Sequence, residues 1–460
     1  MNEYDVVVVG GGPGGYVAAI RASQLGLKTA IVEKETLGGV CLNWGCIPTK
    51  ALLRNAEVIH LLTRGAAFGF SFDNLKIDYE AAYKRSRQVV ERQTKGVTYL
   101  MQKNKIAVYH GTASLKSNTQ LEIQPSAELL AARQIIIATG ARALQLPGVA
   151  IDGEKIITYR EALSLTKAPA SVVIAGSGPT GMEFATIWQR YGAKVTIVEM
   201  LPHLLPLEDE EISQEAERHY KRAGIAIKTG TRVAGMTKTA AGVEVTLVQG
   251  NNTEVITADK ALTAAGFAPN SENLGLEAVG VQTNRGYIEI DRQMRTNIPN
   301  IYAVGDVTGK LGLAHVASAQ GIIAAEASAG LKTPLLDYVK IPRCTYAYPE
   351  VASVGLTEKQ ARAAGYEVIT AKFPFQPNGK ALAMHDSIGF VKIVSEARYK
   401  EILGVHLIGS QVTELIAGPA GMIGLESTVE ELARTIHPHP SLSEVIMEAA
   451  RALAGYAIHL

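Results

Sequence analysis

The sequence has little cysteine, little net charge and no long apolar run. Three cysteines in 460 residues argue against a disulfide-stabilised secreted domain and fit a reducing cytoplasm, where we expect the protein to work. A formal net charge of +1 without long runs of one sign argues against a nucleic-acid partner. No stretch reaches the roughly 18 apolar residues of a membrane span. Because the chain runs from Met1-Asn2-Glu3 straight into the apolar Val6–Val9, we expect no targeting peptide either.

The bulk composition predicts a multidomain α/β protein. The chain has 460 residues, of which 47% are hydrophobic, so it can bury several cores and its length suggests roughly three domains. Its 44 glycines exceed the average usage of about 7%, as a fold with many tight strand–helix turns requires. Val- and Ile-rich strands alternate with helices along the chain, which favours parallel sheets.

Two of the three cysteines, Cys41 and Cys46, lie in one short loop. A disulfide that closes so short a loop would stabilise the fold by only about 2 kcal/mol, and a chain of this size has core enough without it. A zinc site would need Cys-x2-Cys spacing and two more ligands nearby. We therefore interpret the pair as a redox-active dithiol. Pro48 suits the first turn of a helix over Ala51–Leu62, whose positive end would favour a thiolate at Cys46.

The chain contains an internal repeat. Residues 6–33 and 172–199 both read as strand, G-x-G-x-x-G, helix, glycine, strand and a final glutamate, which follows the first glycine by 23 positions in each copy. The glycines allow a tight turn, close approach of a pyrophosphate and helix–strand packing, and the acid accepts hydrogen bonds from ribose hydroxyls. One such motif is weak evidence, but two matched copies predict two dinucleotide-binding units. The residues concerned are Gly10, Gly12, Gly15 and Glu33, and Gly176, Gly178, Gly181 and Glu199.

Two further segments distinguish the repeats. Residues 296–306 predict a short strand ending at Gly305-Asp306, and residues 135–140 end at Thr139-Gly140. Beside two nucleotide-binding units, these segments resemble the second flavin motif and the crossover segment of FAD-dependent oxidoreductases, in which the aspartate contacts the ribityl chain. The first repeat is then expected to bind FAD and the second a nicotinamide cofactor. Glu199 should repel a 2′-phosphate and no arginine follows it, so we predict NAD rather than NADP.

Further motifs match one family. They are CLNWGCIPTK at 41–50, Leu313-Ala314-His315, PEVASVG at 349–355, NGKA at 378–381 and HPHPSLSE at 437–444. With them the chain resembles the dihydrolipoamide dehydrogenases, within the pyridine nucleotide–disulfide oxidoreductases, over essentially its whole length. It departs from the family pattern at Trp44, where a small or aliphatic residue is frequent, and at Gln320, where a glutamate is common.

The resemblance implies catalytic roles for four residues. Cys41 and Cys46 would form the redox disulfide, with the substrate thiol attacking Cys41 and Cys46 facing the flavin. His439 would be the acid–base, and Glu444, five residues later, would orient its ring. Isolated histidines are more often surface or core groups, but this one lies in a proline-broken loop where helical packing does not explain it.

The resemblance also assigns further cofactor contacts. Lys50 and Glu183 would pair beside the isoalloxazine ring, although either could be an ordinary surface charge. Ala314 would contact FAD and Gly266 would contact NAD. Cys344, alone in a predicted strand, is expected to be a buried structural thiol, and two histidines without further ligands predict no metal site.

These observations predict an α/β fold with two Rossmann-like domains, for FAD and NAD, and a C-terminal α+β dimerisation domain. The expected boundaries are 1–149 with 265–335 for the FAD domain and its central segment, 150–264 for the NAD domain and 336–460 for the dimerisation domain. In the last domain we expect helices at Thr357–Ala364 and Thr413–Leu425. The apolar segment 415–425 is too hydrophobic for solvent, so we assign it to the subunit interface of a homodimer.

The expected reaction is oxidation of protein-bound dihydrolipoyl groups with reduction of NAD⁺. The N-terminus leaves no room for a lipoyl domain, so the substrate should arrive on lipoyl-bearing proteins of 2-oxo acid dehydrogenase or glycine cleavage complexes. A glutathione-type reductase would need arginines after Glu199, and a mercuric-type reductase would need a C-terminal cysteine pair, whereas this chain ends Ala-Gly-Tyr-Ala-Ile-His-Leu. A non-catalytic flavin scaffold would leave the thiols and the His–Glu pair unexplained.

Overall fold

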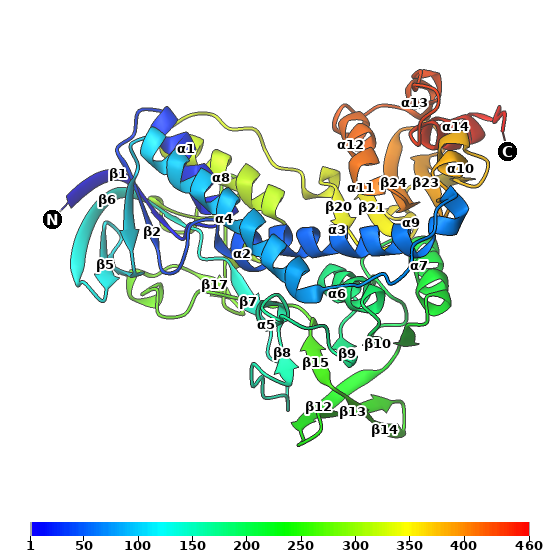
Figure 1. Cartoon of the computed structure of the whole chain (residues 1–460). Coiled ribbons are helices and arrows are strands. Elements are labelled where there is room, and N and C mark those ends of the chain that lie inside the picture. The colour runs from blue at the N-terminus through cyan, green and yellow to red at the C-terminus, as the bar shows by residue number, and fades with distance from the viewer. Residues whose placement is uncertain (1, 460) are drawn as a thin grey trace. The chain divides into compact units, whose positions relative to one another are not determined.

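The computed structural model describes residues 2–459, and the chain forms two compact units (Figure 1). The first unit contains Met1–Ala51, Ala81–Leu144 and Gly266–Leu336, and the second contains Leu52–Glu80, Gln145–Ala265 and Asp337–Leu460. Both units combine sheets with helices, so the predicted α/β class is confirmed.

The main sheet of the first unit is built around β1 (Asn2–Val9). Val6 to Val9 are all buried, because a parallel strand covered on both faces must be apolar along its length. In register, Val8 lies between Ile31 and Ile136 of the neighbouring strands. The strand order is β3 (Ala107–His110), β2 (Thr29–Glu33), β1, β6 (Glu128–Ile137), β5 (Gln120–Gln124) and β4 (Thr112–Ser117), and β19 (Ile301–Ala303) also pairs with β6.

Two helices, α1 (Pro13–Gln24) and α8 (Ala314–Ser328), lie side by side in this unit (Figure 1). They approach closely because glycines meet there: a Cβ on Gly321 would lie 2.4 Å from the Gly14 carbonyl oxygen. The predicted helix over 51–62 is confirmed within a longer helix that begins at Cys46. This unit also contains α2 (Gly39–Trp44), the paired strands β7 (Ala141–Ala143) and β16 (Phe267–Pro269), and β17 (Thr283–Asn284) with β18 (Tyr287–Ile288). Two helices, α3 (Cys46–Thr63) and α4 (Tyr79–Lys103), belong to it in part.

The second repeat forms the first half of the second unit. Its strand–helix–strand core is β9 (Ser171–Ala175), α6 (Pro179–Arg190) and β10 (Lys194–Val198). Helix α6 is deeply buried, and its Trp188 donates an indole hydrogen bond of 3.2 Å to Tyr79. The parallel sheet runs β11 (Ala226–Lys228), β10, β9, β15 (Lys260–Thr263) and β8 (Ile156–Ile157). A separate antiparallel sheet contains β12 (Arg232–Lys238), β13 (Val243–Gln249) and β14 (Asn252–Ala258), and the remaining helices are α5 (Tyr159–Ala162) and α7 (Glu210–Arg222).

The C-terminal part of the second unit is an antiparallel sheet with helices around it. Val391, Ile393, Val405 and Leu407 lie in its hydrophobic core. The strand order is β20 (Arg343–Thr345), β21 (Glu350–Gly355), β24 (Ile402–Gly409), β23 (Phe390–Glu396) and β22 (Val368–Pro374). The helices are α9 (Glu358–Ala363), α10 (Gly379–Ala383), α11 (Val412–Leu415), α12 (Ala417–Gly424), α13 (Val429–Arg434) and α14 (Glu444–Ala454).

A cluster of ion pairs connects α7 with this C-terminal sheet. Lys392, only 2% exposed, contacts Asp209, Glu211 and Glu358 with its Nζ at 3.0, 2.7 and 2.8 Å. Burial lowers the pKa of Lys392, but the hydrogen-bonded carboxylates outweigh it and raise that pKa above its ordinary value. A buried cation is tolerable only with such partners, so these contacts tie the second repeat to the domain that follows it.

Two predictions about the C-terminal domain need correction. The helix expected over Thr413–Leu425 is two helices, α11 and α12, since Pro419 lacks the N–H that a continuous helix would need. Ile416 and Ile423 pack into the domain's own core, whereas Leu425 is 80% exposed. Cys344 lies in β20 as expected, but it is only half-buried, with its Sγ 4.0 Å from the Thr413 carbonyl oxygen.

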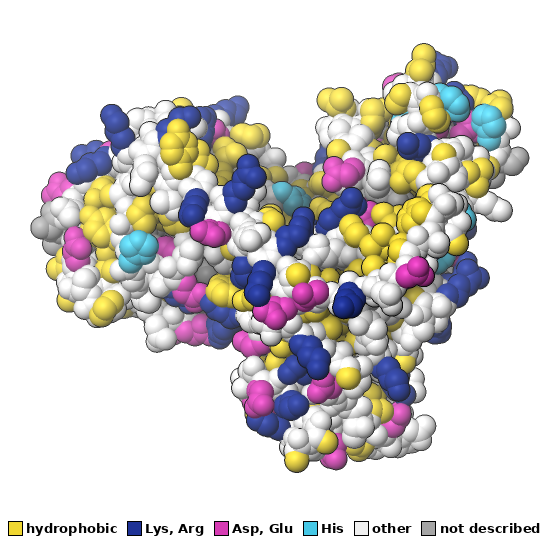
Figure 2. All heavy atoms as spheres, viewed as in Figure 1, with side chains coloured by type: hydrophobic (Ala, Val, Ile, Leu, Met, Phe, Trp, Pro, Cys, Tyr) yellow, Lys and Arg dark blue, Asp and Glu magenta, His cyan; other side chains and the backbone are white. Residues whose placement is uncertain are grey.

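The surface carries charged side chains of both signs (Figure 2). On the face drawn in Figure 2, basic and acidic side chains are interspersed. Among the helices of the described residues, none combines the length and the apolar character that crossing a bilayer needs. The first unit is interrupted between Leu144 and Gly266, near the expected limits 149 and 265, but Leu52–Glu80, expected within the FAD domain, belongs to the second unit. The finer three-domain division stays a prediction.

Candidate active site

The two thiols of the predicted dithiol lie together. Cys41 belongs to α2 and Cys46 is the first residue of α3, and both thiols are half-buried. The hydrogen bond to Cys46 and burial raise the pKa of Cys41, while the charge of Lys50 acts in the opposite direction. These effects make Cys41 harder to ionise. A negative charge on the pair belongs on Cys46, at the start of α3, where the helix dipole favours it.

The dithiol segment packs directly on the glycine loop of the first repeat. A Cβ on Gly39 would lie 2.6 Å from the Gly12 Cα atom, so only glycine lets the two backbones meet. Gly38 and Gly39 turn the chain into α2 with φ values of +98° and +56°. The sequence prediction that the thiols lie beside the first dinucleotide-binding unit is consistent with this contact.

Tyr16 is a neighbour of the dithiol that sequence reasoning missed. It lies on α1, and burial, followed by the charge of Cys41, raises the pKa of its hydroxyl. Tyr16 and Cys41 pack against the same hydrophobic core of the first unit. Tyr16 is the first residue after the G-x-G-x-x-G motif, which is the only sequence signal that could have placed it here.

The first glycine loop is closed around Glu33. Its two carboxylate oxygens accept backbone N–H groups, from Gly11 at 2.6 Å and from Glu35 at 2.7 Å. A Cβ on Gly15 would lie 1.8 Å from the Gly10 carbonyl oxygen, whereas a Cβ on Gly12 would find only the Gly39 Cα atom, at 3.9 Å. The N-terminus of α1 is thus left open beside Gly12, as the pyrophosphate of a dinucleotide requires.

The remaining residues predicted for FAD lie in the same unit. Asp306 follows β19 in a single 3-10 turn (Gly305–Thr308), fixed by Gln320, whose Oε1 accepts the Gly305 N–H at 2.6 Å. Burial raises the pKa of Asp306. Within residues 2–459 no group donates a hydrogen bond to its carboxylate, so the side chain is available to ligand hydroxyls. Ala314 begins α8, and Lys50 lies in α3.

The crossover segment is fixed by one asparagine. Thr139 donates its hydroxyl to the Asn270 carbonyl at 2.6 Å, and the Asn270 amide returns a bond of 3.0 Å to the Thr139 carbonyl. Gly140 has a φ of +70° and open space around its Cβ position. This turn joins the main sheet to the β7–β16 ribbon at the place where the resemblance expects flavin.

The second glycine loop repeats the first with one extra bond. Glu199 accepts the Ser177 N–H at 2.9 Å, the Ser177 hydroxyl at 2.7 Å and the Leu201 N–H at 2.9 Å. A Cβ on Gly181 would lie 2.1 Å from the Gly176 carbonyl oxygen, while the Cβ position of Gly178 is open. The exposed side chain that follows the acid, Met200, cannot hold a phosphate. The loop therefore fits a dinucleotide without a 2′-phosphate.

Two other residues predicted near the cofactors have different surroundings. Glu183 is buried in α6 and accepts the Tyr346 N–H at 3.1 Å. Gly266, expected to contact NAD, has a φ of +119° and lies at the start of the last segment of the first unit, where its carbonyl accepts the Leu144 N–H. Its role in binding NAD stays a prediction.

His439 and Glu444, the pair that the resemblance implied, are in hydrogen-bond contact. His439 Nδ1 lies 2.8 Å from Glu444 Oε1, and the other carboxylate oxygen accepts the Ser441 N–H at 2.9 Å. Burial opposes ionisation of Glu444, but these two hydrogen bonds outweigh it and lower its pKa. His439 is 79% exposed. Its Nε2 is thus the nitrogen open to an incoming thiol.

Asn378, the first residue of the NGKA motif, is a second residue whose role could not be predicted from the sequence. Its Oδ1 caps α10 by accepting the Ala381 N–H at 2.9 Å, and its Nδ2 donates to the Ser441 carbonyl at 3.0 Å. It thereby fixes the loop that carries His439. The neighbouring His437 is half-buried, which lowers its pKa, so it suits loop packing better than proton transfer.

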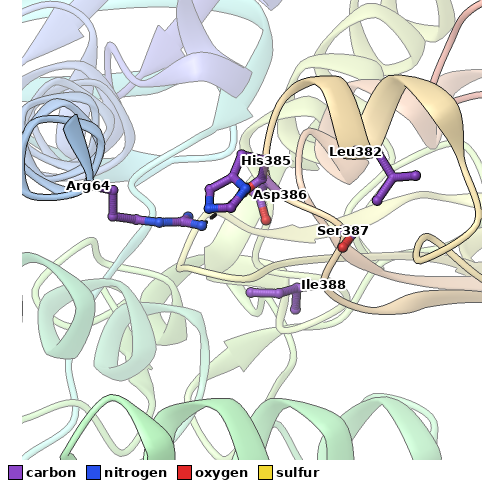
Figure 3. A pocket seen from close by; sticks show the side chains of 6 residues that line it. All are labelled: Arg64, Leu382, His385, Asp386, Ser387 and Ile388. Atoms are coloured by element: carbon purple, nitrogen blue, oxygen red, sulfur yellow. Dashed lines mark hydrogen bonds between the residues drawn. The ribbon is translucent and has the colours of Figure 1, made fainter. Parts of the chain in front are cut away.

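A separate small cavity lies in the second unit. Its volume is about 170 Å³, and Arg64, Leu382, His385, Asp386, Ser387 and Ile388 line it (Figure 3). Arg64 extends towards His385 and donates to its carbonyl at 2.9 Å. Burial and the charges of Arg190 and Arg64 lower the pKa of the adjacent His60 to about 4. No predicted site residue lines this cavity, and across residues 2–459 no group of His, Cys, Asp or Glu side chains forms a candidate metal site.

The predicted residues thus fall into two sets. The dithiol, Lys50 and the residues expected to bind FAD lie in the first unit. The second glycine loop with Glu199, Glu183 and the His439–Glu444 pair lie in the second.

Comparisons with known proteins identify the family. Residues 4–321 match the pyridine nucleotide-disulphide oxidoreductases and residues 341–450 match the dimerisation domain of the same family. The chain is 47% identical to the dihydrolipoyl dehydrogenase of Mycobacterium leprae, covering 100% of both chains, and 45% identical to that of Bacillus subtilis, covering 100% of this chain and 99% of the other.

Solved structures agree. The fold is similar to the crystal structure of LpdA from Mycobacterium tuberculosis, with a TM-score of 0.91, 31% identity and coverage of 98% of this chain and 100% of that one. It is also similar to the HOCl-induced flavoprotein disulfide reductase RclA from Escherichia coli, with a TM-score of 0.87, 26% identity and coverage of 97% and 99%. The chain belongs to the pyridine nucleotide-disulphide oxidoreductase family and, within it, to the dihydrolipoyl dehydrogenases.

Proposed function

We propose that this chain oxidises dihydrolipoyl groups carried by partner proteins and reduces NAD⁺, with Cys41 and Cys46 as the redox pair. The observation that supports this most directly is the packing of the thiol segment on the Gly10–Gly15 loop, next to the expected flavin position. Family membership implies FAD and NAD(H) as cofactors. When bound, FAD passes an electron pair from the dithiol to NAD⁺.

In the proposed reaction, His439 acts first. Its Nε2 takes a proton from one dihydrolipoyl thiol, and Glu444 on Nδ1 stabilises the imidazolium that forms. The resulting thiolate attacks Cys41 Sγ, the Cys41–Cys46 bond breaks, and Cys46 leaves as the thiolate. The second lipoyl thiol then attacks the lipoyl sulfur bound to Cys41, which releases the cyclic disulfide and returns Cys41 to the thiol. Two electrons have moved from lipoyl to the enzyme pair.

We propose that the working unit is a homodimer in which one subunit's His439 serves the partner's dithiol. The match to a dimerisation domain over residues 341–450 supports dimer formation through this region. Exposed apolar side chains on the same domain, Leu425 at 80% and Ile436 at 91%, suit burial against a second copy. The segment 415–425 contributes only part of its apolar surface, because Ile416 and Ile423 are already in the core.

The cofactor contacts follow the two repeats. FAD is proposed to lie on Gly10, Gly12, Gly15, Glu33, Lys50, Thr139, Gly140, Asp306 and Ala314, and NAD on Gly176, Gly178, Gly181, Glu183, Glu199 and Gly266. The FAD, NAD and dimerisation domains are proposed to span 1–149 with 265–335, 150–264 and 336–460. Lipoyl-bearing proteins of 2-oxo acid dehydrogenase or glycine cleavage complexes are the proposed partners, and the cytoplasm is the proposed location.

The decisive experiment is an anaerobic assay of the purified flavoprotein. Dihydrolipoamide with NAD⁺ should be turned over, while glutathione disulfide with NADPH should not. Cys41→Ser and Cys46→Ser should each abolish turnover with FAD still bound. His439→Gln should slow reduction by dihydrolipoamide by about 10²–10⁴-fold and leave reduction by NADH much less affected, and His437→Gln is the matched control. Full activity in either cysteine variant would refute the Cys41–Cys46 redox pair, and a preference for another disulfide substrate would replace this proposal with a related disulfide reductase.

A further inference from the structure

The segment between the two thiols is short and must keep its shape while the disulfide opens and closes. Cys41 lies in α2, Gly45 ends that helix with φ −143° and ψ −113°, and Cys46 begins α3. Thiol–disulfide exchange depends on how the two sulfurs are presented to each other and on which one carries charge. Any group that holds residues 42–45 in place therefore acts on the redox pair.

Asn43 anchors this segment from within. Its side chain is buried, and its Nδ2 donates to the Gly39 carbonyl at 2.9 Å and to the Leu37 carbonyl at 3.2 Å. These bonds tie the end of α2 to its first residue and to the turn that precedes it. The backbone carbonyl of Asn43 accepts a hydrogen bond from a residue in a distant part of the sequence.

That residue is Arg87 of α4. Its Nη1 donates to the Asn43 carbonyl at 3.0 Å, and its guanidinium carbon lies 5.3 Å from the centre of the Trp44 ring. Its Nε and Nη2 atoms are buried without a hydrogen-bond partner, and burial lowers the pKa of Arg87, offset in part by Tyr83. Among residues 2–459 no carboxylate forms an ion pair with it. Its hydrogen bond and its ring contact both go to residues between the thiols.

A half-buried cation without a counter-ion is unfavourable unless a negative charge forms nearby. The oxidised disulfide is neutral, and reduction at neutral pH creates a thiolate on the pair. We propose that Arg87 and Trp44 are positioning residues of the redox pair: Trp44 holds the guanidinium over the segment between the thiols, and Arg87 fixes that segment and favours the reduced, thiolate-bearing form. This inference rests on the proposed function of Cys41 and Cys46.

Of the other ionisable groups, Lys50 on α3 and Tyr16 on α1 interact with Cys41, and Tyr83 on α4 interacts with Arg87. The charge of Lys50 favours ionisation of Cys41, which is the direction that we propose for Arg87. Burial raises the pKa of Tyr16, so its hydroxyl adds no negative charge near pH 7. Removing Arg87 should therefore weaken the electrostatic support of the thiolate without abolishing it, and Trp44 accounts for the stacking that keeps the guanidinium there.

The test measures the redox equilibrium of the holoenzyme instead of its turnover. Wild type, Arg87→Met, Arg87→Lys, Trp44→Val and Trp44→Phe would be equilibrated anaerobically with NADH/NAD⁺ mixtures. The flavin spectrum and the pH dependence of the long-wavelength thiolate band would be recorded. Arg92→Met is the matched control, since Arg92 is an exposed arginine of the same helix.

Arg87→Met should shift the equilibrium towards the disulfide by about tenfold, which is about 30 mV for a two-electron couple, and should move the thiolate band to higher pH. Trp44→Val should shift both readouts in the same direction by less, Trp44→Phe and Arg87→Lys should retain part of the wild-type behaviour, and Arg92→Met should change neither.

Unchanged equilibrium and band in Arg87→Met and Trp44→Val, with FAD content preserved, would overturn the inference. Equal shifts in Arg87→Met and Arg92→Met would overturn it as well. If Arg87→Met does not fold, the Trp44 pair decides alone. Because dihydrolipoamide is not used, these outcomes are independent of whether the proposed substrate is correct.

Discussion

The two glycine loops share one hydrogen-bond plan and differ in what packs against them. In the first, Glu33 accepts the Gly11 N–H at 2.6 Å, and in the second, Glu199 accepts the Ser177 N–H at 2.9 Å. In each, the other carboxylate oxygen accepts the N–H two residues after the acid, from Glu35 or from Leu201. The acids thus hold the shape of the loop as well as being available to a ribose.

The difference lies in the segment after the acid. After Glu33 the chain turns back through Gly38 and Gly39 and places the dithiol on its own glycine loop, with Gly39 against Gly12. After Glu199 the chain leaves through the exposed Met200 and continues to α7, which is tied to the C-terminal sheet through Lys392. The first glycine loop thereby has the redox pair packed beside it, whereas the second stays open for a cofactor that must bind and leave. The segment after the acid, and not the glycine loop itself, therefore distinguishes the roles of the two repeats.

The largest effect should come from adding one methyl group to the third glycine of each loop. In Gly15→Ala the new Cβ would lie 1.8 Å from the Gly10 carbonyl oxygen, and in Gly181→Ala 2.1 Å from the Gly176 carbonyl oxygen. Gly15→Ala should be purified without flavin or fail to fold. Gly181→Ala should remain yellow, be reduced by dihydrolipoamide and transfer no electrons to NAD⁺.

Flavin-to-protein absorbance ratios and stopped-flow reduction check this pair. The matched control is Gly96→Ala, because Gly96 is an exposed glycine within α4 with open space around its Cβ position. That variant should keep both flavin and activity. If Gly15→Ala kept its flavin and Gly181→Ala lost it, the assignment of the two repeats would be reversed.

Much of this arrangement could be predicted from the sequence because it is local or repeated. The two strand–helix–strand units, their acids and the His439–Glu444 pair each depend on short spacings. The contacts that were missed join segments far apart in the chain: Arg87 with Trp44, Asn378 with Ser441, and Tyr16 with Cys41. No periodicity or spacing encodes such pairs. The break between α11 and α12 was different, since Pro419 signalled it and the apolar composition of 415–425 was given more weight.

The next largest effect is expected when the carboxylate of Glu199 or Glu33 is removed. Glu199→Ala removes three hydrogen bonds to a carboxylate, each worth about 1.5–3 kcal/mol in similar settings, although they are not additive. We expect kcat/KM for NAD⁺ to fall by roughly 10–100-fold, and the preference over NADP⁺ to narrow because the repulsive charge is gone. Glu33→Ala should instead speed the loss of FAD. Steady-state kinetics with both nucleotides and flavin-release assays separate the two variants, with the exposed Glu272→Ala as control.

A smaller effect is expected from a new cation after the second acid. Met200 is exposed and follows Glu199 directly, so Met200→Arg could reach a 2′-phosphate on a nucleotide bound there. In the Glu199→Ala background it should raise kcat/KM for NADP⁺ by about tenfold, which corresponds to about 1.4 kcal/mol, and leave that for NAD⁺ nearly unchanged. No gain with NADP⁺ would mean that the ribose lies elsewhere. Lys34 follows Glu33 in the first repeat, and Lys34→Met should leave FAD content unchanged.

The smallest expected effect comes from exchanging the one residue at which the two loops differ in hydrogen bonding. Ser177 is fully buried, its hydroxyl donates to Glu199 at 2.7 Å and accepts the Leu205 N–H at 3.3 Å, and Gly11 has no side chain to offer Glu33. Ser177→Gly keeps the backbone bond to the acid, so we expect only about 1 kcal/mol of lost support, seen as a several-fold higher KM for NAD⁺ with kcat nearly constant. The reverse exchange should be worse, because a Cβ on Gly11 would lie 2.9 Å from a Leu37 methyl carbon and 3.1 Å from a Glu33 carboxylate oxygen. Gly11→Ser should therefore reduce flavin content measurably, whereas Ser177→Gly should not change it. Equal tolerance of the two exchanges would show that the loops are interchangeable and that the dithiol segment does not restrict the first one.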